Sequence, residues 1–326
     1  MPSLQTLIPA AAIAWLASTA SAAYTIQDVY DSSNFFDGFN FYDGPDPTNG
    51  FVDYVNADTA NSAGLAGLSA DGVYMGVDHT TMSPPNGRAS VRLESKKQYT
   101  LGLFIADIKH MPGAECGSWP AFWTYGPDWP NAGEIDIMEG VNTQLTNDVT
   151  LHTSGGCSMN NPNSQPGSVL SNADCSGTGG CGQTTTDPSN YGTGFNDIGG
   201  GVYAMEWTNE AIAVYFFPRY AIPDDISSGN PDPSTWGTPL TNFVGDTCDI
   251  GSHFKDHYIV FDTTFCGDWA GGVWGDQCGA RAATCEDFVS QNPAAFEEGY
   301  WLVNSVKVYT DSGSSKREVV PRSFMA

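Results

Sequence analysis

Basic residues are scarce in this sequence. Its 326 residues include only 12 Lys and Arg against 37 Asp and Glu, which gives a formal net charge of −25 at pH 7. A nucleic acid-binding surface needs many basic side chains to contact phosphates, and a surface this acidic repels anionic membranes and polyanionic substrates. We therefore expect no nucleic acid and no membrane as a partner, and the charge balance favours a neutral substrate.

Long apolar runs are also lacking beyond the first two dozen residues. Residues 7–17 are almost wholly apolar, and Ala20, Ser21 and Ala22 follow them. A membrane-spanning helix needs roughly 20 apolar residues, whereas a shorter run before an A-x-A site is typical of a cleaved secretory signal. The sequence thus predicts a signal peptide over residues 1–22 and a protein that is secreted to the extracellular space.

The remaining residues contain no Pro/Ser/Thr-rich linker and no internal repeat. Roughly 300 residues fit one domain, because β-sandwiches often exceed 200 residues as a single unit. We expect one domain over residues 23–326 that ends in a short flexible tail, and we expect a monomer.

Metal-binding cysteine spacings are missing as well, because no C-x-x-C pair occurs. His253 and His257 make an H-x-x-x-H pattern, but Phe254 stands where a zinc protease needs Glu. We therefore expect no metal and no other cofactor. Eight cysteines behind a predicted signal peptide instead indicate disulfides. Eight cysteines allow 105 pairings, and as nearest neighbours in sequence we expect Cys175–Cys181 and Cys278–Cys285.

Helix signals are few, whereas turn residues are abundant, with 37 Gly and 20 Pro. Short helices are expected only at residues 280–288 and 291–298. Between the turns, short segments alternate apolar and polar residues and are rich in aromatic and β-branched side chains, which predicts an all-β sandwich or jelly roll. These segments are residues 90–95, 99–105, 202–207, 211–217 and 300–309.

Two stretches lack a pattern that could fill a core. Residues 153–193 are rich in Gly, Ser and Asn and hold three cysteines, so they read as a long excursion pinned by disulfides. Residues 222–247 are also irregular. In a sandwich such loops usually border a binding face.

The segment GEIDIMEG at residues 133–140 has a distinctive acidic pattern. Ile135 and Ile137 alternate with Glu134 and Asp136, which predicts a strand with one apolar and one acidic face. In a regular strand Glu139 would fall on the apolar face, where an unpaired charge is costly. A β-bulge at residues 137–138 returns Glu139 to the acidic face. Carboxyl groups this close cannot all ionise easily, so at least one pKa should rise.

One carboxylic acid beside one carboxylate is the pair that glycoside hydrolysis requires. Acidic residues alternating on an exposed strand are more often just a solvated face. The aromatic segment directly upstream favours the catalytic interpretation, because Trp119, Trp123 and Trp129 could pack against the apolar faces of sugar rings.

The sequence EIDIME preceded by WPAFW resembles glycoside hydrolase family 16. Specifically, it resembles the laminarinase-like fungal secreted endo-1,3(4)-β-glucanases, whose E-x-D-x-x-E form carries an extra bulge residue, here Met138. The resemblance covers roughly residues 25–310. Further similar segments are residues 50–55, 90–93, 99–105, 151–153, 202–207 and 300–309.

The resemblance implies a concanavalin-like β-jelly-roll sandwich with a concave substrate cleft. By position, it makes Glu134 the nucleophile, Glu139 the general acid/base and Asp136 the residue that holds the nucleophile. It also implies substrate contacts by aromatic and imidazole side chains: Trp123, Trp129 and His152, and less directly Trp119, Trp269 and Trp274.

The implied activity is retaining hydrolysis of internal linkages in a β-glucan such as laminarin. The linkage stays open among β-1,3, mixed β-1,3/1,4 and branched β-1,3/1,6. Some family members bind a structural Ca²⁺, but we find no loop here with enough clustered oxygen ligands. A β-glucan transglycosylase using the same residues stays an alternative. So does a non-catalytic lectin-like module, although the intact acidic triplet argues against it.

Overall fold

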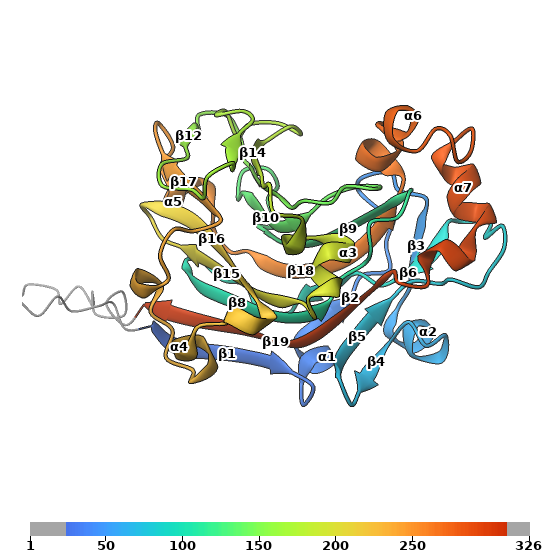
Figure 1. Cartoon of the computed structure of the whole chain (residues 1–326), viewed down its shortest axis with the longest axis horizontal. Helices are drawn as coiled ribbons and strands as arrows, with labels where there is room; N and C mark the ends of the chain where they lie inside the picture. The colour runs from blue at the N-terminus through green and yellow to red at the C-terminus, as the bar shows by residue number, and fades with distance from the viewer. Residues whose placement is uncertain (1–23, 312–326) are drawn as a thin grey trace, which may run out of the picture.

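Two large antiparallel β-sheets pack face to face in the computed structural model, which describes residues 24–311 (Figure 1). The predicted signal peptide, residues 1–22, and the C-terminal tail lie outside the described residues. The nine-stranded sheet runs in the order β12 (Met159–Asn160), β17 (Thr241–Gly245), β16 (Ala211–Pro218), β15 (Gly201–Trp207), β8 (Gly102–His110), β19 (Tyr300–Asp311), β5 (Gly72–Gly76) and β4 (Ala66–Ser69), with β1 (Tyr24–Asp31) also paired to β19.

The eight-stranded sheet carries the acidic segment near its middle. Its order is β13 (Val169–Leu170), β14 (Cys181–Thr184), β11 (Asp148–His152), β10 (Glu134–Glu139), β9 (Ser118–Tyr125), β18 (Tyr258–Phe265), β7 (Leu93–Ser95) and β2 (Phe39–Phe41). A small parallel pair joins β3 (Val52–Tyr54) and β6 (Arg88–Ser90).

The helices are short and lie in the connections between strands. The α-helices are α1 (Phe35–Gly38), α2 (Ala57–Ser62), α3 (Gly192–Asp197), α4 (Asp224–Ser227), α5 (Ile250–His253), α6 (Trp274–Gln277) and α7 (Cys285–Gln291). Single turns of other helix types are η1 (Pro188–Asn190), η2 (Arg219–Ala221), η3 (Pro233–Thr235), η4 (Gly267–Gly271) and η5 (Pro293–Phe296). Among the described residues no helix is long and apolar enough to cross a bilayer.

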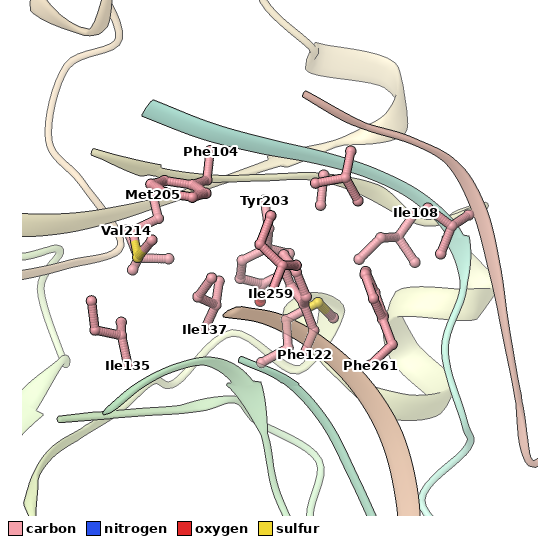
Figure 2. Packing of buried hydrophobic residues seen from close by; sticks show 14 of the residues in the cluster. Phe104, Ile108, Phe122, Ile135, Ile137, Tyr203, Met205, Val214, Ile259 and Phe261 are labelled. Atoms are coloured by element: carbon pink, nitrogen blue, oxygen red, sulfur yellow. The ribbon is translucent and has the colours of Figure 1, made fainter. Parts of the chain in front are cut away.

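The core lies between the inner faces of the two sheets, because strand alternation directs every second side chain there. Figure 2 shows side chains of the two sheets pointing toward one another. The eight-stranded sheet contributes Phe122, Ile135, Ile137, Ile259 and Phe261, and the nine-stranded sheet contributes Phe104, Ile108, Tyr203, Met205 and Val214. The sandwich therefore has the predicted all-β, jelly-roll class.

The strands predicted at residues 202–207 and 211–217 are confirmed as β15 and β16, which pair as a hairpin with Met205 opposite Val214. The long strand predicted at residues 300–309 is β19. The single strand expected at residues 90–95 is wrong, because the chain changes sheets there: β6 pairs with β3, whereas β7 pairs with β18 and β2.

The strand expected at residues 99–105 begins only at Gly102, the first residue of β8, since Leu101 and Gly102 both adopt positive φ angles. The helix expected at residues 280–288 begins later, at α7. There the Thr284 side chain accepts a hydrogen bond from the backbone N–H of Asp287, which caps the first turn. The stretch predicted as a helix at residues 291–298 is the single turn η5.

All eight cysteines form disulfides. The predicted Cys175–Cys181 pair is present, and it closes part of the predicted excursion after β11. The predicted Cys278–Cys285 pair is wrong, because the fold brings Cys278, at the end of α6, to Cys116 just before β9, and brings Cys285, at the start of α7, to Cys266 just after β18. The observed bonds are Cys116–Cys278, Cys157–Cys248 and Cys266–Cys285.

Removing Cys116–Cys278 with paired Ala substitutions is expected to lower the free energy of unfolding by about 2–5 kcal/mol. The bond joins residues 162 positions apart, so the unfolded chain gains much freedom when it is lost. The matched double variant of Cys175 and Cys181, which are 6 positions apart, is expected to lose less. Denaturant titration measures both values, and a larger loss from the short loop would contradict this account.

Candidate active site

A β-bulge in β10 places the acidic side chains on one face. Asp136 pairs with Trp123 of β9, but the next partner, Phe122, lies opposite Met138 rather than Ile137. Pairing with β11 also shifts between Asp136 and Glu139. Ile137 and Met138 are both buried in the core. The predicted bulge is therefore present, and Glu139 faces away from the core with Glu134 and Asp136.

We call this outward side of the eight-stranded sheet the open face. Strand register brings further side chains to it from both neighbours of β10. Glu134 lies opposite His152 on β11 and Tyr125 on β9, and Glu139 lies opposite Asp148 and Ala121. In Figure 1 the excursion around β12 and β14 rises above one side of this sheet, and α6 and α7 rise above the other.

His152 is positioned as a cation beside two of the acids. Its Nε2 lies 3.3 Å from Asp136 Oδ2 and 3.9 Å from Glu134 Oε1. Its Nδ1 lies 3.1 Å from the carbonyl oxygen of Gly177, which can only accept a hydrogen bond. Burial lowers the pKa of His152, but the contacts with Asp136 and Glu134 outweigh it, so the pKa is raised. The imidazolium form fits both of its contacts.

The two glutamates differ in their surroundings. Burial and the charge of Asp136 raise the pKa of both Glu134 and Glu139. At Glu134 the largest effect that opposes this rise is the cation of His152, its partner in the strand register, whereas at Glu139 it is the Trp119 hydrogen bond. Glu139 lies four positions further along β11 from His152. We therefore expect Glu134 to ionise first and Glu139 to keep its proton.

Trp119 contacts Glu139 directly. Its indole Nε1 donates a hydrogen bond to Glu139 Oε1 at 2.8 Å, and this bond lowers the pKa of Glu139 against the larger effect of burial. Trp269, in the turn η4, packs edge-on against Trp119 with ring centroids 5.6 Å apart. The disulfides at Cys266 and Cys278 flank that turn. The indole that touches Glu139 is thus supported from a covalently fixed segment.

Trp123 is held by an ion cluster that sequence patterns did not identify. Its Nε1 donates to Asp262 Oδ1 at 3.3 Å, and the guanidinium of Arg92 lies 5.0 Å from its ring centroid. Arg92 pairs with Glu94 at 2.8 Å and with Asp262 at 3.5 Å. Arg92 is almost fully buried, so these charges compensate one another. The cluster fixes the indole plane of Trp123 beside Asp136.

The other two candidate tryptophans, Trp129 and Trp274, lie in different surroundings. Trp129, in the loop between β9 and β10, is 43% exposed, and its side chain lowers the pKa of Glu134 against the larger effect of burial. Trp274 is buried in a second apolar cluster and donates to the carbonyl of Ala282. The resemblance-based substrate contact at Trp274 is therefore wrong, because its ring fills a core under α7.

Two residue groups within residues 24–311 have metal-compatible spacing. The side-chain ligand atoms of Glu134, Asp136 and His152 lie within 4.8 Å of one another. An imidazole between two carboxylates favours its protonated form, which cannot bind a metal. Cys157, Cys248 and His253 form the other group, but the two sulfur atoms are joined in a disulfide. His257, the second histidine of the H-x-x-x-H pattern, is buried with both ring nitrogens hydrogen-bonded.

These side chains together could support attack by one carboxylate with proton donation from the other carboxyl. The arrangement offers one carboxyl, Glu139, whose raised pKa favours the protonated form beside an indole donor, and a second, Glu134, beside an imidazolium that favours its ionised form. Such a pair can donate a proton to a leaving oxygen and attack the adjoining carbon. Arg92, Asp262 and Tyr125, the parts that sequence reasoning missed, carry no local motif. These residues can be identified as part of the site from the strand register, which places them beside Trp123 and Glu134.

Known proteins match this chain over most of its length. The family described as "XgeA-like, catalytic GH16 domain" matches residues 39–309. A probable endo-1,3(4)-beta-glucanase of Neosartorya fischeri is 51% identical over 81% of this chain and 42% of its own length. An endo-1,3(4)-beta-glucanase of Arthroderma benhamiae is 48% identical over 90% of this chain and 66% of its own length. The chain therefore spans about two-fifths to two-thirds of these relatives.

Two solved structures share this architecture. An elongating GH family 16 beta-1,3-glucosyltransferase is 50% identical, with a TM-score of 0.84, over 88% of this chain and 100% of that one. Laminarinase 16A from Phanerochaete chrysosporium, solved with 6-O-glucosyl-laminaritriose in donor and acceptor sites, is 43% identical, with a TM-score of 0.83, over 89% of this chain and 100% of that one.

Proposed function

This chain belongs to glycoside hydrolase family 16, and from that premise we propose that it is a retaining endo-β-glucanase. Its substrates would be glucans such as laminarin, cut at internal β-1,3 or mixed β-1,3/1,4 linkages. The observation that carries the proposal is the bulge at Ile137–Met138, which places Glu134, Asp136 and Glu139 together on the open face. Its relatives named as endo-1,3(4)-beta-glucanases support the substrate class.

In the first step Glu139 donates its proton to the glycosidic oxygen while Glu134 attacks the anomeric carbon. The leaving sugar departs as an alcohol, and an ester joins the remaining glycosyl group to Glu134. In the second step the Glu139 carboxylate takes a proton from water, and that water displaces Glu134. Two inversions retain the β-configuration, and this requires the carboxyl groups at about 5–5.5 Å.

The neighbouring side chains would prepare both steps. The His152 cation opposes the rise in the pKa of Glu134 and so favours its ionised, nucleophilic form, and Asp136 holds His152 in place. Trp119 holds Glu139 through its indole N–H. Trp123 and Trp129 would provide apolar surfaces for sugar rings. Besides these residues, the steps as written use only the glucan and water.

Purified protein incubated with laminarin, lichenan and a branched β-1,3/1,6-glucan tests the proposal. We expect reducing ends to appear, with short oligosaccharides released and their new anomeric centres initially β by ¹H NMR. Binding to laminarin without the release of reducing ends would instead support a lectin-like module. Initial formation of the α-anomer would contradict the retaining mechanism.

Transglycosylation is a second candidate, because a 50% identical structure belongs to an elongating β-1,3-glucosyltransferase. The first step would be the same, but a glucan hydroxyl would replace water as the acceptor. Mass spectrometry of products from laminarihexaose distinguishes the two. Products longer than the substrate at early times favour transfer, and only shorter products favour hydrolysis.

Trp119→Phe is expected to shift the alkaline limb of kcat/KM to higher pH. Loss of the indole N–H removes a bond that stabilises ionised Glu139, so the pKa of Glu139 rises further. The alkaline limb reports deprotonation of the acid in the free enzyme. The matched control is Trp274→Phe, which removes an indole N–H that donates to the carbonyl of Ala282 rather than to an acid and should leave the limb in place. A Trp119→Phe limb that is unmoved or lowered contradicts the assigned contact.

We also propose a secreted, extracellular monomer with residues 1–22 as its signal peptide and residues 23–326 as one catalytic domain. Four disulfides support an oxidising compartment. Expression in a eukaryotic host tests this by sequencing the amino terminus of protein recovered from the medium. Light scattering on the same sample reports the oligomeric state.

A further inference from the structure

The side chain of Asn147 spans the bulge in β10. Its Nδ2 donates to the carbonyl oxygen of Ile137 at 2.7 Å, and its Oδ1 accepts from the backbone N–H of Glu139 at 2.9 Å. Asn147 is fully buried and is the residue directly before β11. One carboxamide thus binds the backbone on both sides of Met138.

These two backbone groups need such a partner because the bulge interrupts the ladder. In an unbroken antiparallel pair, β11 would supply partners for β10, but the register shifts between Asp136 and Glu139. A buried backbone group without a partner is strongly disfavoured. A carboxamide offers a donor and an acceptor in one plane. Asn147 therefore replaces the missing strand contacts.

We call the side chain of Asn147, with its two hydrogen bonds to the bulge, the clamp. The backbone of Asn147 is itself held by a separate segment of the chain. The backbone N–H of Asn147 donates to Asn190 Oδ1 at 3.1 Å. Its carbonyl accepts from both the backbone N–H and the hydroxyl of Thr185, each at 2.9 Å. Asn190 and Thr185 are buried, and they also hydrogen-bond to each other at 2.8 Å. The carboxamide is thus held in place by polar contacts on a separate segment.

We propose that Asn147 is a positioning residue for the reaction, because it sets where the Glu139 carboxyl lies relative to Glu134. This inference rests on the proposed function, since the position of Glu139 matters only if it transfers the proton. Asn147 itself acts only through the backbone of the bulge.

Asn147→Ala is expected to lower kcat on laminarin by about 100-fold, the loss that an ångström-scale misplacement of a catalytic group can produce. The matched control is Gln183→Ala on β14. Gln183 is also a fully buried amide with two hydrogen bonds, to Asn242 and Ser164, but it does not touch β10. Thermal unfolding shows whether the two variants lose comparable stability.

A substrate whose cleavage needs no general acid distinguishes displacement of Glu139 from a wider loss of active-site structure. A 2,4-dinitrophenyl β-laminaribioside has a leaving group that departs without protonation, and azide attacks the glycosyl-enzyme without a base. With both present, Asn147→Ala should retain activity within about threefold of the wild type if only Glu139 is displaced. A loss as large as that on laminarin would overturn the proposal.

Asn147→Asp provides a second test, which remains informative if the alanine variant folds poorly. The introduced carboxyl can accept from the N–H of Glu139 in either form, but it can donate to the carbonyl of Ile137 only while it is protonated. The ratio of variant to wild-type kcat on laminarin should therefore rise as the pH falls, whereas the ratio for Asn147→Ala should stay flat. A flat ratio for Asn147→Asp overturns the clamp. Wild-type protein that cuts no β-glucan would instead overturn the proposed function.

Discussion

Glu134→Gln is expected to lower kcat on laminarin by about four orders of magnitude or more. The amide cannot form the covalent bond to the anomeric carbon, so the route through the glycosyl-enzyme is lost. The fold should persist, because Gln is isosteric and removes a carboxylate that lies near Asp136 and Glu139. Thermal unfolding of the variant should match or exceed that of the wild type.

Azide identifies the step that Glu134 performs. In the smaller variant Glu134→Ala, azide can enter the vacated space and attack an activated aryl β-glycoside directly. A single inversion then gives an α-glycosyl azide. Recovery of that product by NMR would support Glu134 as the nucleophile. A β-glycosyl azide, or near-wild-type activity of Glu134→Gln on laminarin, would remove Glu134 from this role.

Glu139→Gln is expected to lower kcat on laminarin by about 10²–10⁴-fold, the usual contribution of a general acid or base. The loss should depend on the leaving group, because a dinitrophenyl group departs without a proton. On that substrate the first step stays fast, and the glycosyl-enzyme accumulates because no base activates water.

Azide gives the opposite stereochemical result for Glu139. It attacks the α-linked glycosyl-enzyme formed on Glu134 and restores turnover with a β-glycosyl azide. The control is Asp148→Asn, which removes a carboxylate opposite Glu139 on β11 that the mechanism does not use. Equal losses of kcat/KM, which reports the first step, on laminarin and on the dinitrophenyl substrate would show that Glu139 does not act as the acid.

The bulge could be predicted because the sequence left no other favourable place for Glu139. Ile135 and Ile137 mark the apolar face of the strand, so a regular strand would have buried the charge of Glu139 on that face. The same local reasoning predicted β15, β16 and β19, whose alternation is long and uninterrupted. Patterns within one strand carry that information.

The parts that could not be predicted depend on which strands become neighbours. Arg92 lies in an alternating segment, but it reaches Trp123 and Asp262 only because β7, β18 and β9 are adjacent. Cys278 bonds Cys116 rather than its neighbour in sequence, because the fold brings the end of α6 to the residues just before β9. Asn147 resembles any turn asparagine until the bulge beside it is seen.

Trapping the covalent intermediate tests the central claim most directly. A 2-deoxy-2-fluoro-β-laminaribiosyl fluoride should inactivate the enzyme, because the fluorine slows hydrolysis of the glycosyl-enzyme more than its formation. Peptide mapping by mass spectrometry should then find one fluoro-laminaribiosyl group, attached to Glu134. A label on Glu139 or on any other residue, or hydrolysis that proceeds with no labelled protein, would contradict the account.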